Sequence, residues 1–250
     1  MNEKNWNERT ELLLGSDKLD ELTNSHVLIV GLGGVGGIAA EFICRAGVGK
    51  ITIIDGDVVD TTNRNRQIAA LTSTVGMSKA EVIRKRLFDI NPDAEVQVID
   101  RFIEEDEFVS LLEKGNYDYV IDAIDTIGAK LSLILACLRL KIKFISSMGA
   151  GDKIDPSKIK VDDISATYGC GLAKSVRKKL RVVGIHKGVK VVFSHETGYG
   201  TTKSSSFAFS EDRKVCKTVV GTISYMPSIF GCLCASEAIR FLISEKQKRS

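Results

Sequence analysis

HVLIVGLGGVGGIAAEFICRAGVGKITIIDGDVVDTTNRNRQ, residues 26–67, is the stretch of this sequence that decides the fold. An apolar run at 27–30 ends in a glycine cluster, a helical pattern follows, and a second apolar run at 51–54 ends on Asp55. This order predicts a strand, a tight turn, a helix and a parallel second strand, which together form the βαβ unit of nucleotide-binding sheets.

The glycine cluster predicts a phosphate-binding turn. Gly31 permits the tight turn, Gly33 lets backbone N–H groups approach a phosphate, and Gly36 lets the helix pack closely on the strand, with Gly34 between them. The helix start carries free N–H groups and a partial positive charge, which favour an anion. Asp55 follows the second strand, where it can accept hydrogen bonds from a ribose. We therefore expect a nucleotide at this turn.

The composition is that of one large folded domain. The chain has 250 residues, of which 44% are hydrophobic, and its net charge is +3. A charge this small neither requires nor excludes a nucleic acid partner, because the placement of charges matters more than their sum. None of the six cysteines forms a CxxC pair, and the start MNEKNWNER lacks the apolar core of a signal peptide. We therefore expect a cytoplasmic protein without a zinc site.

Apolar strand patterns alternate with helical patterns along the chain. The expected elements are one or two helices within 1–25, helices at 78–90, 104–112, 126–140 and 172–180, strands at 96–99, 117–124, 143–147, 159–161 and 190–194, and an apolar helix at 225–243. The alternation predicts an α/β fold with a Rossmann-like, doubly wound, mostly parallel sheet and helices on both faces.

We expect a single domain over residues 1–250 with three parts. These are an N-terminal helical segment at 1–25, a nucleotide-binding core at 26–148, and a substrate-side extension at 149–250 made of short strands, a crossover loop and a buried apolar helix. The stretch 196–222, rich in Gly, Ser and Thr, reads as a mobile connection. The apolar run from Tyr225 to Ile243 contains Pro227, Glu237 and Arg240, which favours a core helix over a membrane span.

The N-terminal segment has leucines that fit one packed face, Leu12, Leu13, Leu14, Leu19 and Leu22. Arg9 lies just ahead of that face. On the local pattern alone, Arg9 is a solvated surface charge, since an exposed charge needs no partner.

Polar residues after the second strand indicate which nucleotide is bound. Asp57 is followed by Asn63, Arg66 and Gln67, and Lys79 comes thirteen residues after Arg66. Two cations at the nucleotide end of the sheet suit a triphosphate better than a diphosphate. A nicotinamide dinucleotide would not need them, so these residues argue against an NAD-binding redox protein.

Asp125 ends the fourth predicted strand, where an open α/β sheet presents residues to a ligand. A carboxylate near a polyphosphate could hold Mg²⁺ through oxygen. The alternative is a charge that the dipole of the next helix stabilises.

These residues resemble those of the ATP-dependent adenylating enzymes related to ubiquitin-activating enzymes and to the ThiF and MoeB activators of the sulfur carriers ThiS and MoaD. The residues that stand at the family's spacing are Arg9, Asp55, Asn63, Arg66, Gln67, Lys79 and Asp125. Within the family, the chain is most similar to the tRNA threonylcarbamoyladenosine dehydratases. The sequence segments on which this similarity rests are RTELLLG at 9–15, TNRNRQIAAL at 62–71, VIDAIDT at 120–126 and GAGDKIDPSKIKVDDIS at 149–165.

The resemblance implies an enzyme that uses ATP and Mg²⁺ to adenylate the threonyl carboxylate of threonylcarbamoyladenosine beside the tRNA anticodon. The activated group then closes a ring, and AMP and pyrophosphate are released. Asp55 would bind the ribose, Arg66 and Lys79 the phosphates, and Asp125 the Mg²⁺. Arg9 would reach the site of a partner subunit, so the resemblance implies a homodimer. A sulfurtransferase-type accessory protein is a further implied partner.

A second function remains open, that of an adenylating activator of a ubiquitin-like or sulfur-carrier protein. Such activators use two CxxC zinc pairs, which this sequence lacks, or a catalytic cysteine, for which Cys170 and Cys216 are candidates. The basic segment from Lys174 to Arg181 fits a surface for a phosphate backbone and equally a solvated helix face.

Overall fold

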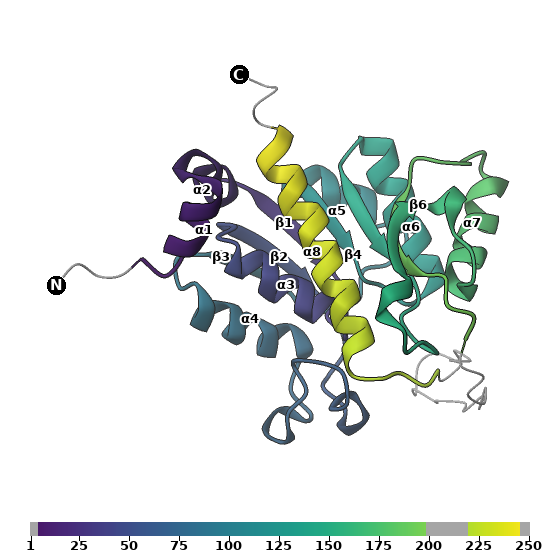
Figure 1. Cartoon of the computed structure of the whole chain (residues 1–250), viewed down its shortest axis with the longest axis horizontal. Coiled ribbons are helices and arrows are strands. Elements are labelled where there is room, and N and C mark those ends of the chain that lie inside the picture. The colour runs from purple at the N-terminus through teal and green to yellow at the C-terminus, as the bar shows by residue number, and fades with distance from the viewer. Residues whose placement is uncertain (1–4, 199–219, 246–250) are drawn as a thin grey trace.

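The structure is a computed structural model that describes residues 5–198 and 220–245. It contains one seven-stranded sheet with strands β1 His26–Val30, β2 Lys50–Ile54, β3 Glu95–Ile99, β4 Tyr119–Asp122, β5 Phe144–Ser147, β6 Ile159–Asp163 and β7 Lys190–Ser194. The strand order is β3-β2-β1-β4-β5-β7-β6 (Figure 1). All neighbouring strands are parallel except β6, which pairs antiparallel with β7 at one edge.

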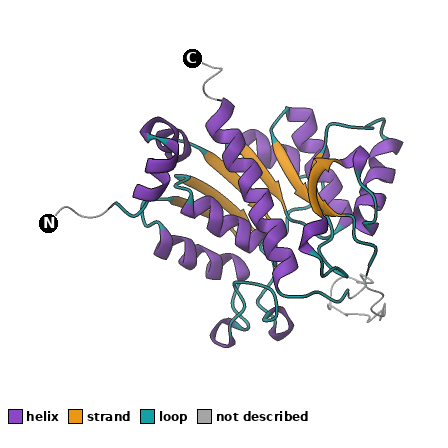
Figure 2. Ribbon diagram, viewed as in Figure 1, coloured by secondary structure: helices purple, strands orange, loops and turns teal. Residues whose placement is uncertain are grey.

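Helices cover both faces of this sheet. They are α1 Glu8–Leu14, α2 Ser16–Thr23, α3 Gly36–Arg45, α4 Lys79–Ile90, α5 Phe108–Gly115, α6 Ile127–Leu140, α7 Gly171–Val182 and α8 Tyr225–Glu245. Figure 2 shows the strands as a central layer with helices around it. The predicted doubly wound, mostly parallel α/β fold is confirmed.

The two faces have separate hydrophobic cores because side chains alternate along each strand. Val27 and Ile29 of β1 point into the core that α3, α4 and α8 cover, whereas Leu28 and Val30 point into the core under α5, α6 and α7. Every residue of β1 is buried. A strand buried on both faces is typical of the centre of a parallel sheet.

Helix α8 is the apolar helix predicted for the C-terminal part, and it packs across the sheet beside α3 (Figure 1). Met226, Phe230, Cys234, Ala238 and Leu242 are buried at the spacing of one helical face. By length and composition, α8 is the one described helix that could cross a membrane. Because that face completes the core, the prediction of a buried core helix is confirmed.

Several boundaries differ from the predictions. Helix α5 begins at Phe108 rather than near residue 104, and it includes Gly115, because the chain reverses only at Asn116, which is left-handed with φ 49°. Strand β4 ends at Asp122, so Asp125 lies three residues beyond the strand rather than at its end.

The N-terminal segment forms two short helices, α1 and α2. Leu19 and Leu22 of α2 are buried as predicted, but Leu12 and Leu13 of α1 are 79% and 82% exposed, so the prediction that they pack in this chain is wrong. Of the predicted connection at 196–222, residues 199–219 lie outside the described part of the chain, so its mobility stays a prediction.

Candidate active site

The candidate site lies where strand order reverses. β1 has β2 on one side and β4 on the other, so the carboxyl ends of these three strands meet at one edge of the sheet. This edge carries the glycine turn, Asp55 and the loop after β4. A crevice at such a reversal is the usual ligand site of an open α/β sheet.

The glycine turn is held tightly between β2 and the loop after β4. The N–H of Gly31 donates to the carbonyl of Ile54 at 2.8 Å, and its φ of 87° is one that L-residues rarely adopt. A Cβ added at Gly31 would lie 2.8 Å from the carbonyl oxygen of Ala123, and one at Gly36 would lie 1.7 Å from that of Gly31. The predicted reasons for Gly31 and Gly36 are therefore confirmed.

Gly33 and Gly34 face different surroundings. A Cβ at Gly33 would meet only Nε2 of Gln67, at 3.8 Å, so the space in front of this glycine is open. A Cβ at Gly34 would lie 2.8 Å from Cβ of Pro227 at the start of α8. Gly34 is thus needed for helix packing, whereas Gly33 has room in front of it and a phosphate there stays a prediction. A nucleotide contact at Gly34 stays a prediction.

Asp55 is oriented by two backbone donors. Its Oδ2 accepts a hydrogen bond from the N–H of Leu32 at 2.6 Å, and its Oδ1 accepts one from the N–H of Asp57 at 2.8 Å. The side chain is buried, and burial raises the pKa of this carboxyl above its ordinary value, although both hydrogen bonds oppose the rise. Because each carboxylate oxygen has two lone pairs, Asp55 can still accept ribose hydroxyls.

Gln67 faces the glycine turn and has an unsatisfied acceptor. Its Oε1 is buried and is one of four buried polar side-chain atoms without a partner in the described part of the chain. Buried acceptors are nearly always paired, so Oε1 of Gln67 could accept from a ligand hydroxyl or amine. Nε2, the Gln67 atom that faces Gly33, could donate to a phosphate oxygen. This observation supports a nucleotide at Gly33 and Gln67.

Asn63 is built into the loop that precedes Gln67. Its Oδ1 accepts from the N–H of Asp60 at 3.1 Å, while the Asp60 carboxylate accepts from the N–H of Thr62 at 2.7 Å. These reciprocal bonds cap the 3-10 helix at Thr61–Asn63. The side-chain oxygen of Asn63 thus shapes the loop, and a direct ligand contact from this residue stays a prediction.

The two predicted phosphate ligands have different environments. Lys79 is the first residue of α4, its side chain is 7% exposed, and its Nζ pairs with Oδ2 of Asp57 at 2.8 Å. The guanidinium of Arg66 donates to the carbonyl of Thr62 at 3.0 Å and to Oδ1 of Asn65 at 2.8 Å. Both cations are held by neighbouring oxygens, but among the described residues only Lys79 is paired with a carboxylate.

A surface hollow of about 570 Å³ lies on the same loop, lined by Thr61, Thr62, Arg64, Asn65, Ala70, Leu71 and Thr72. Neither the glycine turn nor Asp55 lines it. We therefore do not assign this hollow to the nucleotide.

Asp125 is exposed on the loop after β4, and its Oδ1 accepts from the hydroxyl of Thr126 at 3.3 Å. Across the described ranges 5–198 and 220–245, no group of three or more His, Cys, Asp or Glu side chains could hold a metal ion. Mg²⁺ commonly uses one or two carboxylates together with phosphate oxygens and water. Asp125 fits that pattern only with a bound polyphosphate.

Arg9 is not part of this site in the single chain. It is exposed on α1, and Nδ2 of Asn7 beside it would lie 3.7 Å from a Cβ added at Gly47. Gly47 leads into the amino end of β2, at the opposite edge of the sheet from the site. Arg9 therefore lies away from the candidate site of its own chain, and a role for it in the site of a second copy stays a prediction.

Comparison with known proteins identifies the family. Residues 7–250 match the model of the ThiF family. The chain belongs to the ThiF family. Its tRNA threonylcarbamoyladenosine dehydratase relatives include one from Bacillus subtilis, 40% identical over 95% of this chain and 94% of the relative. One from Escherichia coli is 37% identical over 98% of this chain and 97% of the relative.

Solved structures and a second class of relative complete the comparison for this ThiF-family chain. The crystal structure of the E. coli dehydratase TcdA with ATP has a TM-score of 0.87 and 35% identity, with both chains covered to 100%. The E. coli molybdopterin-synthase adenylyltransferase is 27% identical over 90% of this chain and 76% of its own length.

The structure of this ThiF-family chain also shows a buried polar cluster beneath the site that the sequence did not reveal. Asp122 and Lys130 are both 0% exposed, and Nζ of Lys130 lies 2.7 Å from Oδ2 of Asp122. Ser146 Oγ donates to the same oxygen at 2.6 Å, and Oδ1 of Asp122 accepts from the N–H of Ile124 at 3.0 Å. Asp122 therefore fixes the start of the loop that carries Asp125. The only sequence signal was a lone lysine in the apolar helix IGAKLSLILACLRL.

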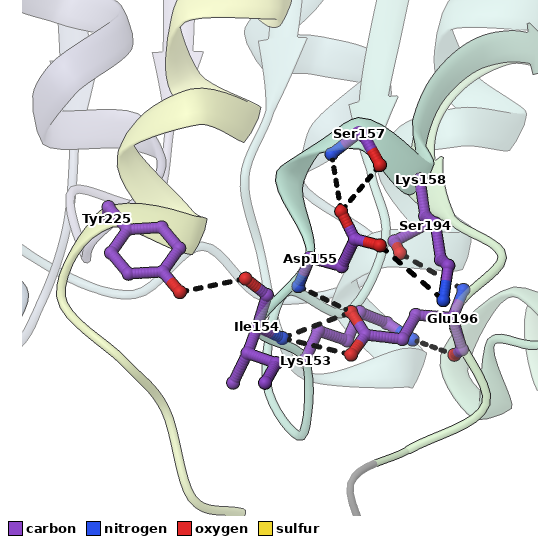
Figure 3. A network of polar contacts seen from close by, with 8 residues as sticks. All are labelled: Lys153, Ile154, Asp155, Ser157, Lys158, Ser194, Glu196 and Tyr225. Carbon is purple, nitrogen blue, oxygen red and sulfur yellow. Dashed lines mark hydrogen bonds and ion pairs between the residues drawn. The ribbon is translucent and has the colours of Figure 1, made fainter.

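A second network holds the substrate-side extension together (Figure 3). The Glu196 carboxylate accepts N–H bonds from Ile154 at 3.0 Å and Asp155 at 2.9 Å, and Nζ of Lys153 donates to the Glu196 carbonyl at 2.8 Å. The Tyr225 hydroxyl donates to the Ile154 carbonyl at 2.8 Å. The loop after β5, the end of β7 and the start of α8 are thus joined. GDKIDPSKI, singled out in the sequence, contributes one side of this network.

Of the two candidate cysteines, Cys170 is buried and is the N-cap residue of α7. A thioester-forming thiol must reach a protein tail, so burial argues against this role. Cys216 lies outside the described residues.

Proposed function

We propose that this chain is an ATP-dependent tRNA threonylcarbamoyladenosine dehydratase. The family match and the full-length relatives support an adenylating enzyme. The dehydratases of B. subtilis and E. coli are 40% and 37% identical to this chain, against 27% for the E. coli molybdopterin-synthase adenylyltransferase. The observation that carries the assignment on the structural side is the likeness to an ATP-bound dehydratase over the whole chain. The Gln67 side-chain amide supports a nucleotide there, because its Nε2 faces the open Gly33 and its buried Oε1 has no partner among the described residues.

The reaction has two steps that balance without any other reactant. A carboxylate oxygen of the threonyl group attacks the α-phosphorus of ATP, the bond to the β-phosphate oxygen breaks, and pyrophosphate leaves. A nucleophilic atom of the same modified side chain then attacks the acyl carbon and loses its proton, and AMP leaves with one of the original carboxylate oxygens. The net change in the nucleoside is the loss of one water.

The chain's own residues supply binding and charge. Asp55 binds the ribose hydroxyls, and the turn at Gly31–Gly36 receives the nucleotide. Arg66 and Lys79 neutralise the phosphates and the charge that develops on the leaving pyrophosphate, which is the usual form of transition-state stabilisation for such groups. Asp57 orients Lys79 through their 2.8 Å pair. Asp125 would hold Mg²⁺ together with ATP oxygens, and the ion would supply further positive charge.

The active form is a homodimer with shared sites, in the cytoplasm. Two observations support shared sites: Arg9 is at the opposite edge of the sheet, and Leu12 and Leu13 beside it are exposed apolar residues on the same short helix. Large apolar side chains that are exposed in the single chain often mark a protein interface. Leu12 and Leu13, next to Arg9, therefore suit an interface between two copies of the chain. A sulfurtransferase-type protein is a candidate accessory partner. We expect no stoichiometric zinc, and metal analysis that found it would overturn this expectation.

Exchange of labelled pyrophosphate into ATP tests the adenylation step directly. We expect exchange that requires tRNA bearing threonylcarbamoyladenosine and does not occur with tRNA lacking that group. Ubiquitin-like carrier proteins with free C-terminal carboxylates serve as the competing substrate. Exchange with a carrier protein but not with the modified tRNA would establish the alternative function and reject this one.

A further inference from the structure

We propose that the exposed basic face of α7 binds the phosphate backbone of the tRNA, along the stem that leads away from the anticodon loop. The basic face consists of Lys174, Lys178 and Arg181. This inference rests on the proposed function, because it takes the tRNA as the substrate whose modified base enters the site. The chemistry it requires is a row of cations opposite the regular negative charges of an RNA strand.

Charge is concentrated around α7 far beyond the average of the chain. Residues 171–195 contain seven Lys and Arg and no Asp or Glu, whereas the whole chain has 35 basic and 32 acidic residues. Lys190 is paired with Glu237 at 2.9 Å. Within the described part of the chain, the salt bridges include none with Lys174, Lys178 or Arg181. Among the described residues, no carboxylate therefore competes with an external anion for these three cations.

The three cations share one face of the helix. Lys178 is one turn beyond Lys174, and Arg181 nearly one further turn, so their stems emerge in a row with about 6 Å of rise per four residues. Together with Arg177 and Val182 they line a surface hollow of about 490 Å³. A row of cations along a shallow hollow fits a strand of phosphates better than a single small anion.

The opposite face of α7 prevents the helix from turning its cations inward. Ala173, Val176 and Leu180 are fully buried in the core under the sheet. Arg177, between the two faces, donates to the carbonyl of Thr167 at 2.7 Å. The basic face is thus presented on a fixed element, so binding needs little ordering of the protein.

The start of α7 lies at the same edge of the sheet as the nucleotide site. A Cβ added at Gly149, just past β5, would lie 3.6 Å from Leu172, and one at Gly169 would lie 2.5 Å from the carbonyl oxygen of His195, just past β7. The carboxyl ends of parallel strands define that edge. Lys174 is therefore nearest the site edge, and Arg181 is farther from it. Figure 1 shows α7 on the β6 side of the molecule, next to α6.

The direction of α7 fits a base that enters the site while the rest of the RNA continues outward. A membrane surface is the competing anionic partner, since Val182 and Val183 are 81% and 53% exposed. These two apolar side chains occupy only the far end of the helix. An amphipathic membrane helix needs an apolar face along its length, and the apolar face of α7 is already buried.

A matched pair of charge variants tests the inference. The test variant is K174Q/K178Q/R181Q, and the control is K114Q/K141Q/K143Q, which removes the same charge from exposed lysines at the amino edge of the sheet. We expect the test variant to raise the KM for modified tRNA by ~10-fold or more at low salt and to flatten the slope of log affinity against log salt by ~2. The control variant, and the charge-preserving K174R/K178R, should behave as wild type. The KM for ATP should not change.

Two results would overturn the inference. One is a test variant with the wild-type KM for tRNA and the wild-type salt slope, and the other is a control variant whose KM and salt slope change as much as those of the test variant. Binding of labelled tRNA, measured by fluorescence anisotropy, gives the same comparison without turnover. If wild type fails to convert modified tRNA, the proposed function falls, and the anisotropy measurement still decides the role of α7. Tighter binding to anionic phospholipid vesicles than to tRNA, lost in the test variant, would assign the surface to a membrane instead.

Discussion

At the scale of single residues, Asp122 and Lys130 are the most consequential pair that does not touch the proposed ligand. Both are fully buried, and Asp122 also holds the N–H of Ile124 at the start of the loop with Asp125. A buried charge that loses its partner is strongly destabilising, whereas removing both charges together is often tolerated.

We expect Lys130→Met to reduce the free energy of unfolding by ~3–5 kcal/mol, because it leaves the Asp122 carboxylate buried and uncompensated. The double variant D122N/K130M should recover a large part of this loss. Urea denaturation of the three proteins measures the effect. A single variant as stable as wild type would show that Asp122 finds another partner or takes up a proton.

Arg66 and Lys79 are predicted to stabilise the negative charge that develops on the leaving pyrophosphate. Arg66→Ala or Lys79→Ala should lower the rate of adenylation by ~10²-fold or more, the scale for loss of one group that stabilises developing charge. Arg84→Ala is the matched control, since it removes a partly exposed cation on α4 that pairs with Glu81 and has no part in the proposed site. Pyrophosphate exchange at a near-normal rate in either charge variant would remove these residues from the mechanism.

Residue-level prediction from sequence worked where local spacing fixes the geometry. Asp55 follows its strand directly, so its place beside the glycine turn could be predicted. Asp122 and Lys130 could not be paired in the same way, because Ser146 from a neighbouring strand completes their site. The pairing of Lys79 with Asp57 was also not predictable, because the two residues are 22 positions apart in sequence and meet only in the folded chain.

At the scale of elements, the turn between β1 and α3 gives a matched pair of substitutions. Gly36→Ala should destabilise the fold, because its Cβ would lie 1.7 Å from the Gly31 carbonyl oxygen. Gly33→Ala should leave stability near wild type, because its Cβ would meet only Gln67 at 3.8 Å. The same added methyl should weaken ATP binding, since it would occupy the space proposed for a phosphate.

Thermal unfolding and ATP titration separate these effects. We expect Gly36→Ala to lose stability and Gly33→Ala to fold normally but lose ATP affinity. A Gly33→Ala protein that binds ATP as wild type does would move the phosphate away from this turn.

Element boundaries were predictable where a cap marks them. Ser78 accepts from the N–H of Glu81 at 3.2 Å and begins α4 as expected. The ends of β4 and α5 were not predictable, because the apolar pattern runs past the last paired residue of β4, and the left-handed turn occurs at Asn116 rather than at Gly115. Patterning shows that an element exists, whereas neighbouring strands decide where pairing stops.

At the scale of the whole molecule, shared sites can be tested by mixing two inactive variants. Arg9→Ala and Arg66→Ala should each be inactive alone. In a mixed dimer, one site has Arg66 from one copy and Arg9 from the other, so about a quarter of wild-type activity should return, because half of the dimers are mixed and each has one intact site. Activity that stays absent after subunit exchange would place Arg9 outside the site.

The overall architecture followed from the sequence because alternation of strands and helices leaves few topologies for a parallel sheet. The antiparallel placement of β6 at the edge did not follow, because a short alternating strand fits either direction. The exposure of Leu12 and Leu13 was also missed, since apolar patterning alone does not show whether a helix face is buried in its own chain.

The most direct test of the central claim follows an oxygen atom. Modified tRNA with both oxygens of the threonyl carboxylate labelled with a heavy isotope is incubated with ATP and the enzyme. The masses of the products are then measured by mass spectrometry. Adenylation followed by ring closure predicts one labelled oxygen in AMP, one AMP for each nucleoside that loses a water, and no label in pyrophosphate. Unlabelled AMP, or a nucleoside that keeps both labelled oxygens while ATP is consumed, would contradict the account.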